Sequence, residues 1–382
     1  MTDGTRLAPL EMLDRLVAFE TESDTSNLAL VDFVADYLSA WGVAARRLPN
    51  RDGTKAALLA TLGPPDRPGI VLSGHTDCVP VEGQAWTSDP FRLRIADGRA
   101  YGRGSVDMKG FDALALAAVP AMLSAGLATP IHLLLSYDEE TTCLGANDAI
   151  ALFGRDLPLP LAAIVGEPTG LTVVDAHKSV ASFVTRVHGR EAHSAKPALG
   201  ASAVMVAADL IAELNRMSDE LETRGDHSGR FDPPCSTVHV GRVVGGNARN
   251  ILAKECLFAS EFRGLPNLDP NEIPDRFARE VERVTRGRLN RHGPFGRVET
   301  EWEVLVPGLA PDPGSWAERL ALGLTGAAAT ATVPFGTEAA ISRRPASRRS
   351  CAGQARSTRR ISRTSTSPWR RSPREKLSSD GL

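Results

Sequence analysis

Long apolar runs are missing from this chain: among its 382 residues, none approaches the roughly 18 consecutive apolar residues that a membrane-spanning helix needs. The N-terminus also lacks the charged and then apolar pattern of a secretion signal. The five cysteines are scattered, without a Cys-x-x-Cys pair, which argues against a disulfide framework and against a cysteine-based zinc site. We therefore expect a cytoplasmic protein with reduced thiols.

Basic residues are sparse in the body of the chain and abundant at its end. Residues 341–382 contain eleven Arg and one Lys against two acids, a net charge of +10, so with an overall charge of −2 residues 1–340 carry −12. An acidic body is typical of a cation-binding enzyme and disfavours a nucleic-acid surface. The basic tail leaves a nucleic-acid-binding arm open as an alternative, but the tail lacks the interleaved aromatic residues of single-strand binders.

The length of the chain predicts about two domains. In residues 1–178, apolar runs bounded by Gly and Pro alternate with helical periodicity, which predicts an α/β domain with a mainly parallel sheet. The expected helices are residues 9–41, broken near 23–27, and residues 111–125; the expected strands are residues 56–62, 69–72, 131–136 and 162–165.

A second pattern begins near residue 179. A strand, a helix, two strands and a further helix follow the β-α-β-β-α-β order of ferredoxin-like domains, over residues 182–188, 201–214, 237–244, 251–263 and 272–286. We therefore predict a domain inserted at residues 179–306 and a return to the first domain at residues 307–340. Residues 341–382 are expected to be an aberrant, basic, low-complexity tail.

Two early segments each carry a candidate site residue: His75 with Asp77 after a predicted strand, and Asp107 before a predicted helix. His75 and Asp77 come just after a buried strand, a spacing that suits a metal ligand and a carboxylate that orients its ring. The alternative is an ordinary loop histidine capped by Asp77. Asp107 lies among glycines at the start of a helix, where it is either an N-cap or a ligand whose glycine neighbours permit an unusual backbone.

Carboxylates follow two further strands. Three acids at residues 138–140 repel one another unless a cation lies beside them, although a solvated turn is the alternative. Glu167 follows another apolar strand. Because ligand sites in open α/β sheets form beyond the carboxyl ends of the strands, these acids and His75 together predict a site for Zn²⁺, Co²⁺ or Mn²⁺. Such a site activates water and polarises a carbonyl group.

At these residues the chain resembles the M20 family of metallo-aminoacylases and peptidases, over residues 10–340. The matching motifs are Leu-Ser-Gly-His-Thr-Asp at 72–77, Trp-Thr-Ser-Asp-Pro-Phe at 86–91, Asp-Met-Lys-Gly-Phe at 107–111, Tyr-Asp-Glu-Glu at 137–140, and Gly-Glu-Pro-Thr at 166–169 with His-Lys-Ser at 177–179. They are most similar to those of family members that deacetylate N²-acetyl-L-ornithine in arginine biosynthesis. The resemblance implies an M20-type catalytic domain with a mostly parallel sheet flanked by helices, plus an inserted ferredoxin-like domain that dimerises.

The resemblance also implies a role for each motif residue. His75, Asp107 and Glu167 would hold one Zn²⁺ or Co²⁺ ion, and Asp107 and Glu140 would hold a second. Asp77 would orient His75, and Glu139 would be the general base that carries a proton from water to the leaving amine.

Three residues of the inserted domain complete the expected site. In a homodimer, His193 would stabilise the oxyanion in the partner's active site, while Asn250 and Arg263 would bind the carboxylate of the substrate. Taken by itself, such a histidine is more often a surface or satisfied histidine than a catalytic one.

The chain departs from the family near its end. The second metal needs a further His in a late Gly-Pro-Gly-Ser…Ala-His-Lys-Pro-Asp-Glu segment, but no His follows His292. A reading frame shifted by one nucleotide just before Ile341 permits codons for Phe-Gln-Glu-Ala-Gly-Ile-Pro-Ser-Phe-Val-Cys-Gly-Pro-Gly-Ser-Ile-Asp-Gln-Ala-His-Lys-Pro-Asp-Glu-Tyr over residues 341–366. We interpret the tail as frameshifted; a real disordered basic tail is the alternative. Either way we expect a weakened second metal site, an unpaired sheet edge, exposed apolar surface and impaired activity.

The sequence therefore favours a hydrolase acting on a small N-acyl amino acid, with N²-acetyl-L-ornithine as the expected substrate. The alternatives are another M20 deacylase or dipeptidase, acting for example on succinyl-diaminopimelate, and a catalytically inactive dimeric remnant. We expect neither a nucleic-acid nor a membrane partner.

Overall fold

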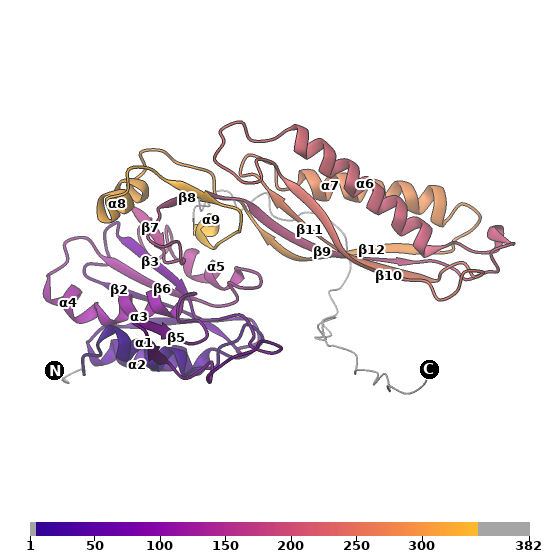
Figure 1. The fold of residues 1–382 in the computed structure, drawn as a ribbon. Coiled ribbons are helices and arrows are strands. Elements are labelled where there is room, and N and C mark those ends of the chain that lie inside the picture. The colour runs from indigo at the N-terminus through magenta and orange to yellow at the C-terminus, as the bar shows by residue number, and fades with distance from the viewer. Residues whose placement is uncertain (1–4, 343–382) are drawn as a thin grey trace. The chain divides into compact units, whose positions relative to one another are not determined.

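A computed structural model describes residues 5–342 of the chain (Figure 1). The expected tail, with its alternate-frame interpretation, lies outside the described residues except for Ile341 and Ser342, which end the short helix α9. Within the described part, no helix is both long and apolar enough to cross a membrane.

The N-terminal half builds a five-stranded sheet in the order β1-β2-β6-β3-β7. The bounds of these strands are β1 Ala45–Pro49, β2 Ala56–Leu62, β3 Ile70–His75, β6 Ile131–Ser136 and β7 Ala162–Val165. The expected strands at residues 56–62, 131–136 and 162–165 are thus confirmed to the residue, because each is an apolar run bounded by Gly, Pro or polar residues.

Helices cover both faces of this sheet. Leu58 and Ala60 of β2 pack with helices α1, α2 and α3 on one face, whereas Leu59 packs with α5 on the other, as the alternation of side chains along a strand requires (Figure 1). The helices of this half are α1 Pro9–Val17, α2 Leu28–Ala40, α3 Lys109–Ala117, α4 Val119–Ser124 and α5 Asn147–Ile150. The expected helix at 111–125 is divided after Ala117: α4 begins at Val119 with Pro120 in its first turn, where a proline is tolerated.

The α/β class is confirmed, but the sheet is mixed and not mostly parallel. Strand β3 pairs in parallel with β6 and β7, whereas β2 pairs antiparallel with β1 and β6. The β1-β2 pair has a local reason: the two strands form a hairpin closed by a turn at residues 50–55, in which Asn50 N–H donates to Lys55 O, and a hairpin pairs its strands antiparallel. The β2-β6 pair, with Leu58 opposite Leu135, joins strands far apart in the sequence and has no such local signal.

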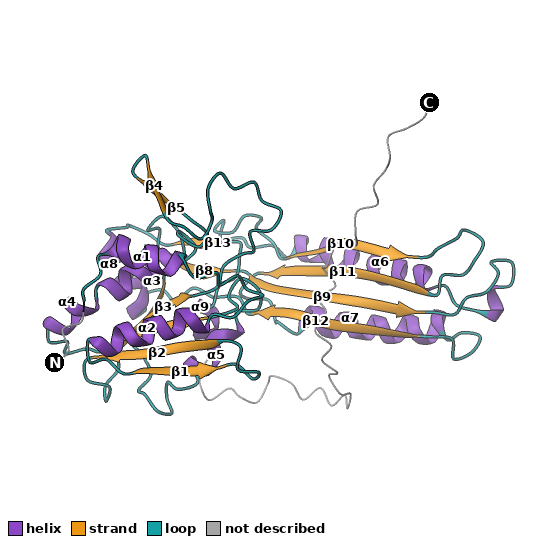
Figure 2. Cartoon of the chain, turned by 90° about the horizontal axis from the view of Figure 1, so that it is seen from below, coloured by secondary structure: helices purple, strands orange, loops and turns teal. Residues whose placement is uncertain are grey.

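A four-stranded antiparallel sheet follows in the order β10-β11-β9-β12, with α6 and α7 on one face (Figure 2). The bounds are β9 Ser179–His188, α6 Ala203–Thr223, β10 Thr237–Gly245, β11 Glu255–Gly264, α7 Glu272–Val284 and β12 Arg297–Val306. This is the expected ferredoxin-like order. The strands β9 and β12 begin and end beside the predicted domain boundaries, which themselves remain predictions.

The remaining elements are short. They are β4 Arg94–Ala96 and β5 Arg99–Tyr101, which form a hairpin, β8 Val174–His177 and β13 Ala331–Val333, which pair in parallel, and the helices α8 Trp316–Thr325 and α9 Ala339–Ser342. The two-stranded β13-β8 sheet is separate from the five-stranded sheet.

Candidate metal centre

The predicted ligands meet at the carboxyl ends of three adjacent parallel strands. His75 is the last residue of β3, Glu139 and Glu140 follow β6, and Glu167 follows β7. Asp107 precedes α3, which packs against β3, and the peptide bond between Asp107 and Met108 is cis. The order β6-β3-β7 therefore places side chains from distant parts of the sequence at one edge of the sheet.

His75 is the fully buried centre of the group. Its Nε2 lies 3.1 Å from Asp107 Oδ1 and 3.9 Å from Glu139 Oε2. Its Nδ1 lies 2.9 Å from the Asp77 carbonyl oxygen and 3.4 Å from Asp77 Oδ1. The ring is thus held on one side by Asp77 and presents its other nitrogen to the carboxylates.

Asp77 organises the loops around it. Its carboxylate accepts hydrogen bonds from the Ser23 hydroxyl at 2.7 Å and from the backbone N–H groups of Glu139 at 3.1 Å and Glu140 at 3.3 Å. Although burial opposes ionisation, the hydrogen bond with His75 and these donors hold the pKa of Asp77 below its usual value. One ionised side chain thereby positions both the histidine and the two glutamates.

The ligand atoms fall into two overlapping sets. His75, Asp107 and Glu140 each place a ligand atom within 4.8 Å of the others, and so do His75, Glu139 and Glu167. The expectation grouped Glu167 with Asp107, whereas the structure groups Glu167 with Glu139, the expected base. All the predicted ligands are nonetheless brought together, with His75 common to both sets.

The electrostatics of the group suit a cation. Burial, with the charges of nearby acids, raises the pKa of Glu139 to about 8 and that of Glu140 and of Glu167 to about 7, because neighbouring carboxylates in a dry site resist ionisation. The Glu167 Oε1 atom is buried without a hydrogen-bond partner. A buried, unpartnered acceptor on a side chain grouped with His75 and Glu139 fits a divalent ion, which compensates for the negative charge of the neighbouring acids.

Two buried acids near the site were not anticipated. Glu338 accepts hydrogen bonds of 2.6 Å from the hydroxyls of Ser73 and Ser136, which lie at the ends of β3 and β6. Asp112 of α3 is wholly buried, has one carboxylate oxygen without a partner, and has its pKa raised well above the usual value by burial. Neither acid lies within a metal-ligand spacing in the sequence, so no pattern identified them.

The expected site residues between 179 and 306 are not in either ligand group found among the described residues. His193 is exposed and its Nδ1 accepts a hydrogen bond from the Ala195 N–H at 3.1 Å. Asn250 is its neighbour, since Ser194 N–H donates to the Asn250 carbonyl at 2.9 Å. Arg263, on β11, pairs with Glu261. The structure thus brings His193 and Asn250 together and leaves Arg263 with a different partner.

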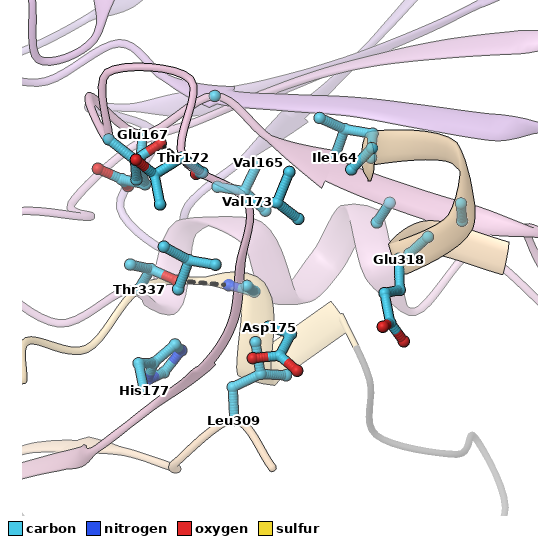
Figure 3. A pocket seen from close by; sticks show the side chains of 18 of the residues that line it. Ile164, Val165, Glu167, Thr172, Val173, Asp175, His177, Leu309, Glu318 and Thr337 are labelled. Carbon is cyan, nitrogen blue, oxygen red and sulfur yellow. Dashed lines mark hydrogen bonds between the residues drawn. The ribbon is translucent and has the colours of Figure 1, made fainter. Parts of the chain in front are cut away.

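Glu167 also borders a cavity of about 470 Å³ (Figure 3). The cavity lies between β7 and β8 and is bounded by α8, β13 and residues 335–339. Its wall is largely apolar, with acids such as Asp175 and Glu318 at its margin.

Comparison with known proteins gives a consistent result. The family described as "Peptidase family M20/M25/M40" matches residues 71–345. The chain is 37% identical over 276 residues to an acetylornithine deacetylase of Pasteurella multocida (strain Pm70), an alignment that spans 69% of this chain and 70% of that protein. It is 35% identical over 261 residues to an acetylornithine deacetylase of Proteus mirabilis (strain HI4320), spanning 68% and 66% of the two chains.

Solved structures agree on the fold. An M20 family metallo-carboxypeptidase from Sulfolobus solfataricus superimposes with a TM-score of 0.65 at 17% identity, covering 86% of each chain. A tripeptidase from Staphylococcus aureus superimposes with a TM-score of 0.62 at 19% identity, covering 87% of this chain and 86% of that one.

Proposed function

The chain belongs to peptidase family M20/M25/M40, and from that premise we propose that it is a metal-dependent amidohydrolase that converts N²-acetyl-L-ornithine into L-ornithine and acetate. The substrate is supported by the acetylornithine deacetylases to which the chain is similar. The reaction class is supported by one observation above all: an imidazole and four carboxylates converge at the ends of adjacent parallel strands. A role in arginine biosynthesis and a cytoplasmic location follow from the same proposal.

We propose that His75, Asp107, Glu140 and Glu167 would hold one or two divalent ions, Zn²⁺ or Co²⁺. A divalent ion held there would polarise the amide carbonyl and activate a water molecule. Asp107 can act as a ligand beside His75 because its Oδ1 lies 3.1 Å from His75 Nε2.

Glu139 is assigned as the general base. It is adjacent in sequence to the ligand Glu140, only 10% of its side chain is exposed, and its backbone N–H is fixed by Asp77. From this position its carboxylate can take a proton from the attacking water and deliver it to the leaving amine. Asp77 takes no proton itself; it fixes the ring of His75 and the backbone that carries the base.

The four-stranded sheet is proposed to form a homodimer and to supply the rest of the site. His193 is exposed and makes no described contact with the metal group of its own chain, as expected for a side chain that acts in the site of a second copy. There it would stabilise the oxyanion, while Asn250 and Arg263 would hold the carboxylate of the substrate.

A second candidate is a catalytically inactive dimeric remnant, because the sequence supplies no histidine after His292 for the second metal position. The deciding experiment expresses the chain as written and with its alternate frame restored, and assays both on N²-acetyl-L-ornithine with added Co²⁺ or Zn²⁺. If the frame-restored chain hydrolyses the substrate and the chain with the printed sequence does not, the result supports the amidohydrolase proposal and shows that the printed sequence has impaired activity.

Two comparisons sharpen this assay. Succinyl-diaminopimelate and a dipeptide, tested at equal concentration, should give a lower kcat/KM than N²-acetyl-L-ornithine; a higher value for either would replace the proposed substrate. Glu139→Gln in the restored chain is the negative control. If the restored, metal-loaded chain cleaves none of the three substrates, the proposed amidohydrolase function is rejected.

A further inference from the structure

Lys55 contacts two segments that support the metal group, although no sequence motif identified it. It is the last residue of the turn between β1 and β2, and only 13% of its side chain is exposed. Its ammonium donates to the Ser23 carbonyl oxygen at 2.5 Å and pairs with the carboxylate of Asp138. Because burying an unpaired ammonium costs free energy, these two contacts explain why a lysine is accommodated there.

The two partners of Lys55 lead to the same carboxylate, that of Asp77, from different parts of the chain. The Ser23 hydroxyl donates to Asp77 Oδ2 at 2.7 Å. Asp138 precedes residues 139–140, whose backbone N–H groups donate to Asp77 Oδ1 at 3.1 Å and to Asp77 Oδ2 at 3.3 Å. Lys55 therefore connects the segment of the hydroxyl donor to the turn that supplies the two backbone donors.

The backbone of Asp138 adopts a conformation that an L-residue seldom takes. Its φ is +58°, in the left-handed region. Its carbonyl oxygen accepts from the backbone N–H groups of residues 142–143, at 2.9 and 2.8 Å, which closes a turn shortly after β6. Turns that contain a left-handed residue can direct successive N–H groups at one anion, as residues 139–140 do with Asp77. The ion pair with Lys55 holds the residue on which this geometry depends.

We propose that Lys55 is a positioning residue for the metal centre: it holds Asp138 in the left-handed conformation and thereby keeps the backbone of residues 139–140 against Asp77. Lys55 belongs to neither ligand set among the described residues, so it acts through these neighbours and not on a bound ion. The inference rests on the proposed function, because the two glutamates at 139–140 are its base and one of its ligands. An ion pair that only stabilises the fold would instead lower Tm and leave the geometry of the metal centre unchanged.

Lys55→Met removes the charge and the donors of this side chain while keeping it long and unbranched. Titration calorimetry of the full chain with Zn²⁺ should show about tenfold weaker binding than in the unmodified chain, as for the loss of other groups that support metal ligands. Lys55→Arg keeps a charge and donors and should recover most of the affinity. Lys254→Met, at an exposed lysine, is the matched control. Equal Zn²⁺ affinities of Lys55→Met and Lys254→Met would overturn the proposal.

Hydrogen exchange separates positioning from a purely structural role, and it needs no metal. In Lys55→Met, exchange should accelerate about tenfold at the amides of residues 139–140 and stay unchanged in β2 and β6, because only the turn beside Asp77 opens. Equal acceleration throughout β2 and β6, or none at residues 139–140, would contradict the positioning role. If the unmodified chain binds no Zn²⁺, the proposed metal centre fails, but the exchange measurement still decides the role of Lys55.

Two substitutions at Asp138 test the route through its backbone and cover the case in which Lys55→Met does not fold. Glycine adopts the left-handed conformation readily, whereas alanine does not. Asp138→Gly should therefore retain most of the Zn²⁺ affinity of the unmodified chain, and Asp138→Ala should bind Zn²⁺ about tenfold more weakly. Equal affinities of these two variants would show that the left-handed conformation is not what Lys55 maintains, and the proposal would fall.

Discussion

The hydroxyl of Ser73 donates a 2.6 Å hydrogen bond to the buried carboxylate of Glu338, a residue 265 positions later in the chain. Ser136 donates to the other oxygen of the same carboxylate. Glu338, the residue before α9, therefore connects the start of α9 to β3, which ends at His75, and to β6, which precedes Glu139 and Glu140.

Glu338→Ala should destabilise the protein. It removes the acceptor of the buried Ser73 hydroxyl and leaves the Ser136 hydroxyl with only the Gly74 carbonyl at 3.4 Å. An unpaired buried group costs about 1–3 kcal/mol in the free energy of unfolding. Urea denaturation measures the loss. Glu82→Gln, at an exposed glutamate, is the control and should change the midpoint little. A Glu338→Ala chain as stable as the unmodified protein would show that the two hydrogen bonds contribute nothing.

Asp77→Asn should weaken metal binding without removing a ligand. The backbone carbonyl of Asp77 keeps its 2.9 Å contact with His75, but the carboxylate, which lies 3.4 Å from His75 Nδ1 and accepts from the N–H groups of residues 139 and 140, becomes a neutral amide. Changes of this kind typically cost about 10–100-fold in affinity. Titration calorimetry with Zn²⁺ measures the effect. Asp66→Asn, whose side chain is 76% exposed, is the matched control. Equal affinities for the two variants would remove Asp77 from the proposed role.

Glu139→Gln should separate binding from turnover. In the frame-restored chain, kcat should fall by about 10²–10⁴-fold because the amide cannot accept a proton, while KM changes little. Steady-state kinetics on N²-acetyl-L-ornithine give both constants. A rise in KM at unchanged kcat would instead make Glu139 a substrate contact.

Gly166→Ala should disturb the ligand that follows it. A Cβ atom at residue 166 would lie 2.0 Å from Phe111 Cγ, so either the ring or the Glu167 loop must move. Overpacking of this kind costs about 1–3 kcal/mol, and metal affinity should fall as Glu167 shifts. Phe111→Leu in the same chain should restore part of both losses. Gly287→Ala, where no atom lies within 4 Å, is the control; if Gly166→Ala matches it in Tm and metal affinity, the predicted clash is relieved without consequence.

Metal stoichiometry should differ between the two forms of the chain. The chain as written should bind one Zn²⁺ tightly and a second weakly or not at all, because the second position lacks a histidine after His292. The restored chain should bind two. Titration calorimetry distinguishes the cases, and two equal, tight sites in the chain as written would contradict the assignment of the missing ligand. The nucleotide sequence of the gene gives an independent check on the frame.

The core strands and the metal group were predictable because both depend on local patterns. A buried strand such as β6 is an apolar run between polar or Gly and Pro residues, and its site residues come directly after it. Because the carboxyl ends of neighbouring parallel strands lie at one edge of a sheet, the sequence alone predicts that His75, Glu139 and Glu167 lie close together.

The supporting contacts were not predictable. Ser23 meets Asp77 across 54 positions and Ser73 meets Glu338 across 265, and a lone serine or glutamate carries no signal of so distant a partner. The mixed character of the sheet was also not predicted. The short strand β1 gives no clear sequence pattern, because each of its five residues is either partly buried or exposed. Helix α8 went unrecognised although its sequence contains a serine cap and a terminal glycine.

That helix has a consequence for the fate of the protein in a cell. Because none of the residues of α8 is fully buried, we expect α8 to open at a lower free-energy cost than the cores of the two larger sheets. Each such opening uncovers the apolar residues around Leu324 and Phe335, already 76% and 44% exposed, to chaperones and proteases. The amount of this protein in a cell would then depend on how often chaperones and proteases bind the region around α8, and not on unfolding of the core.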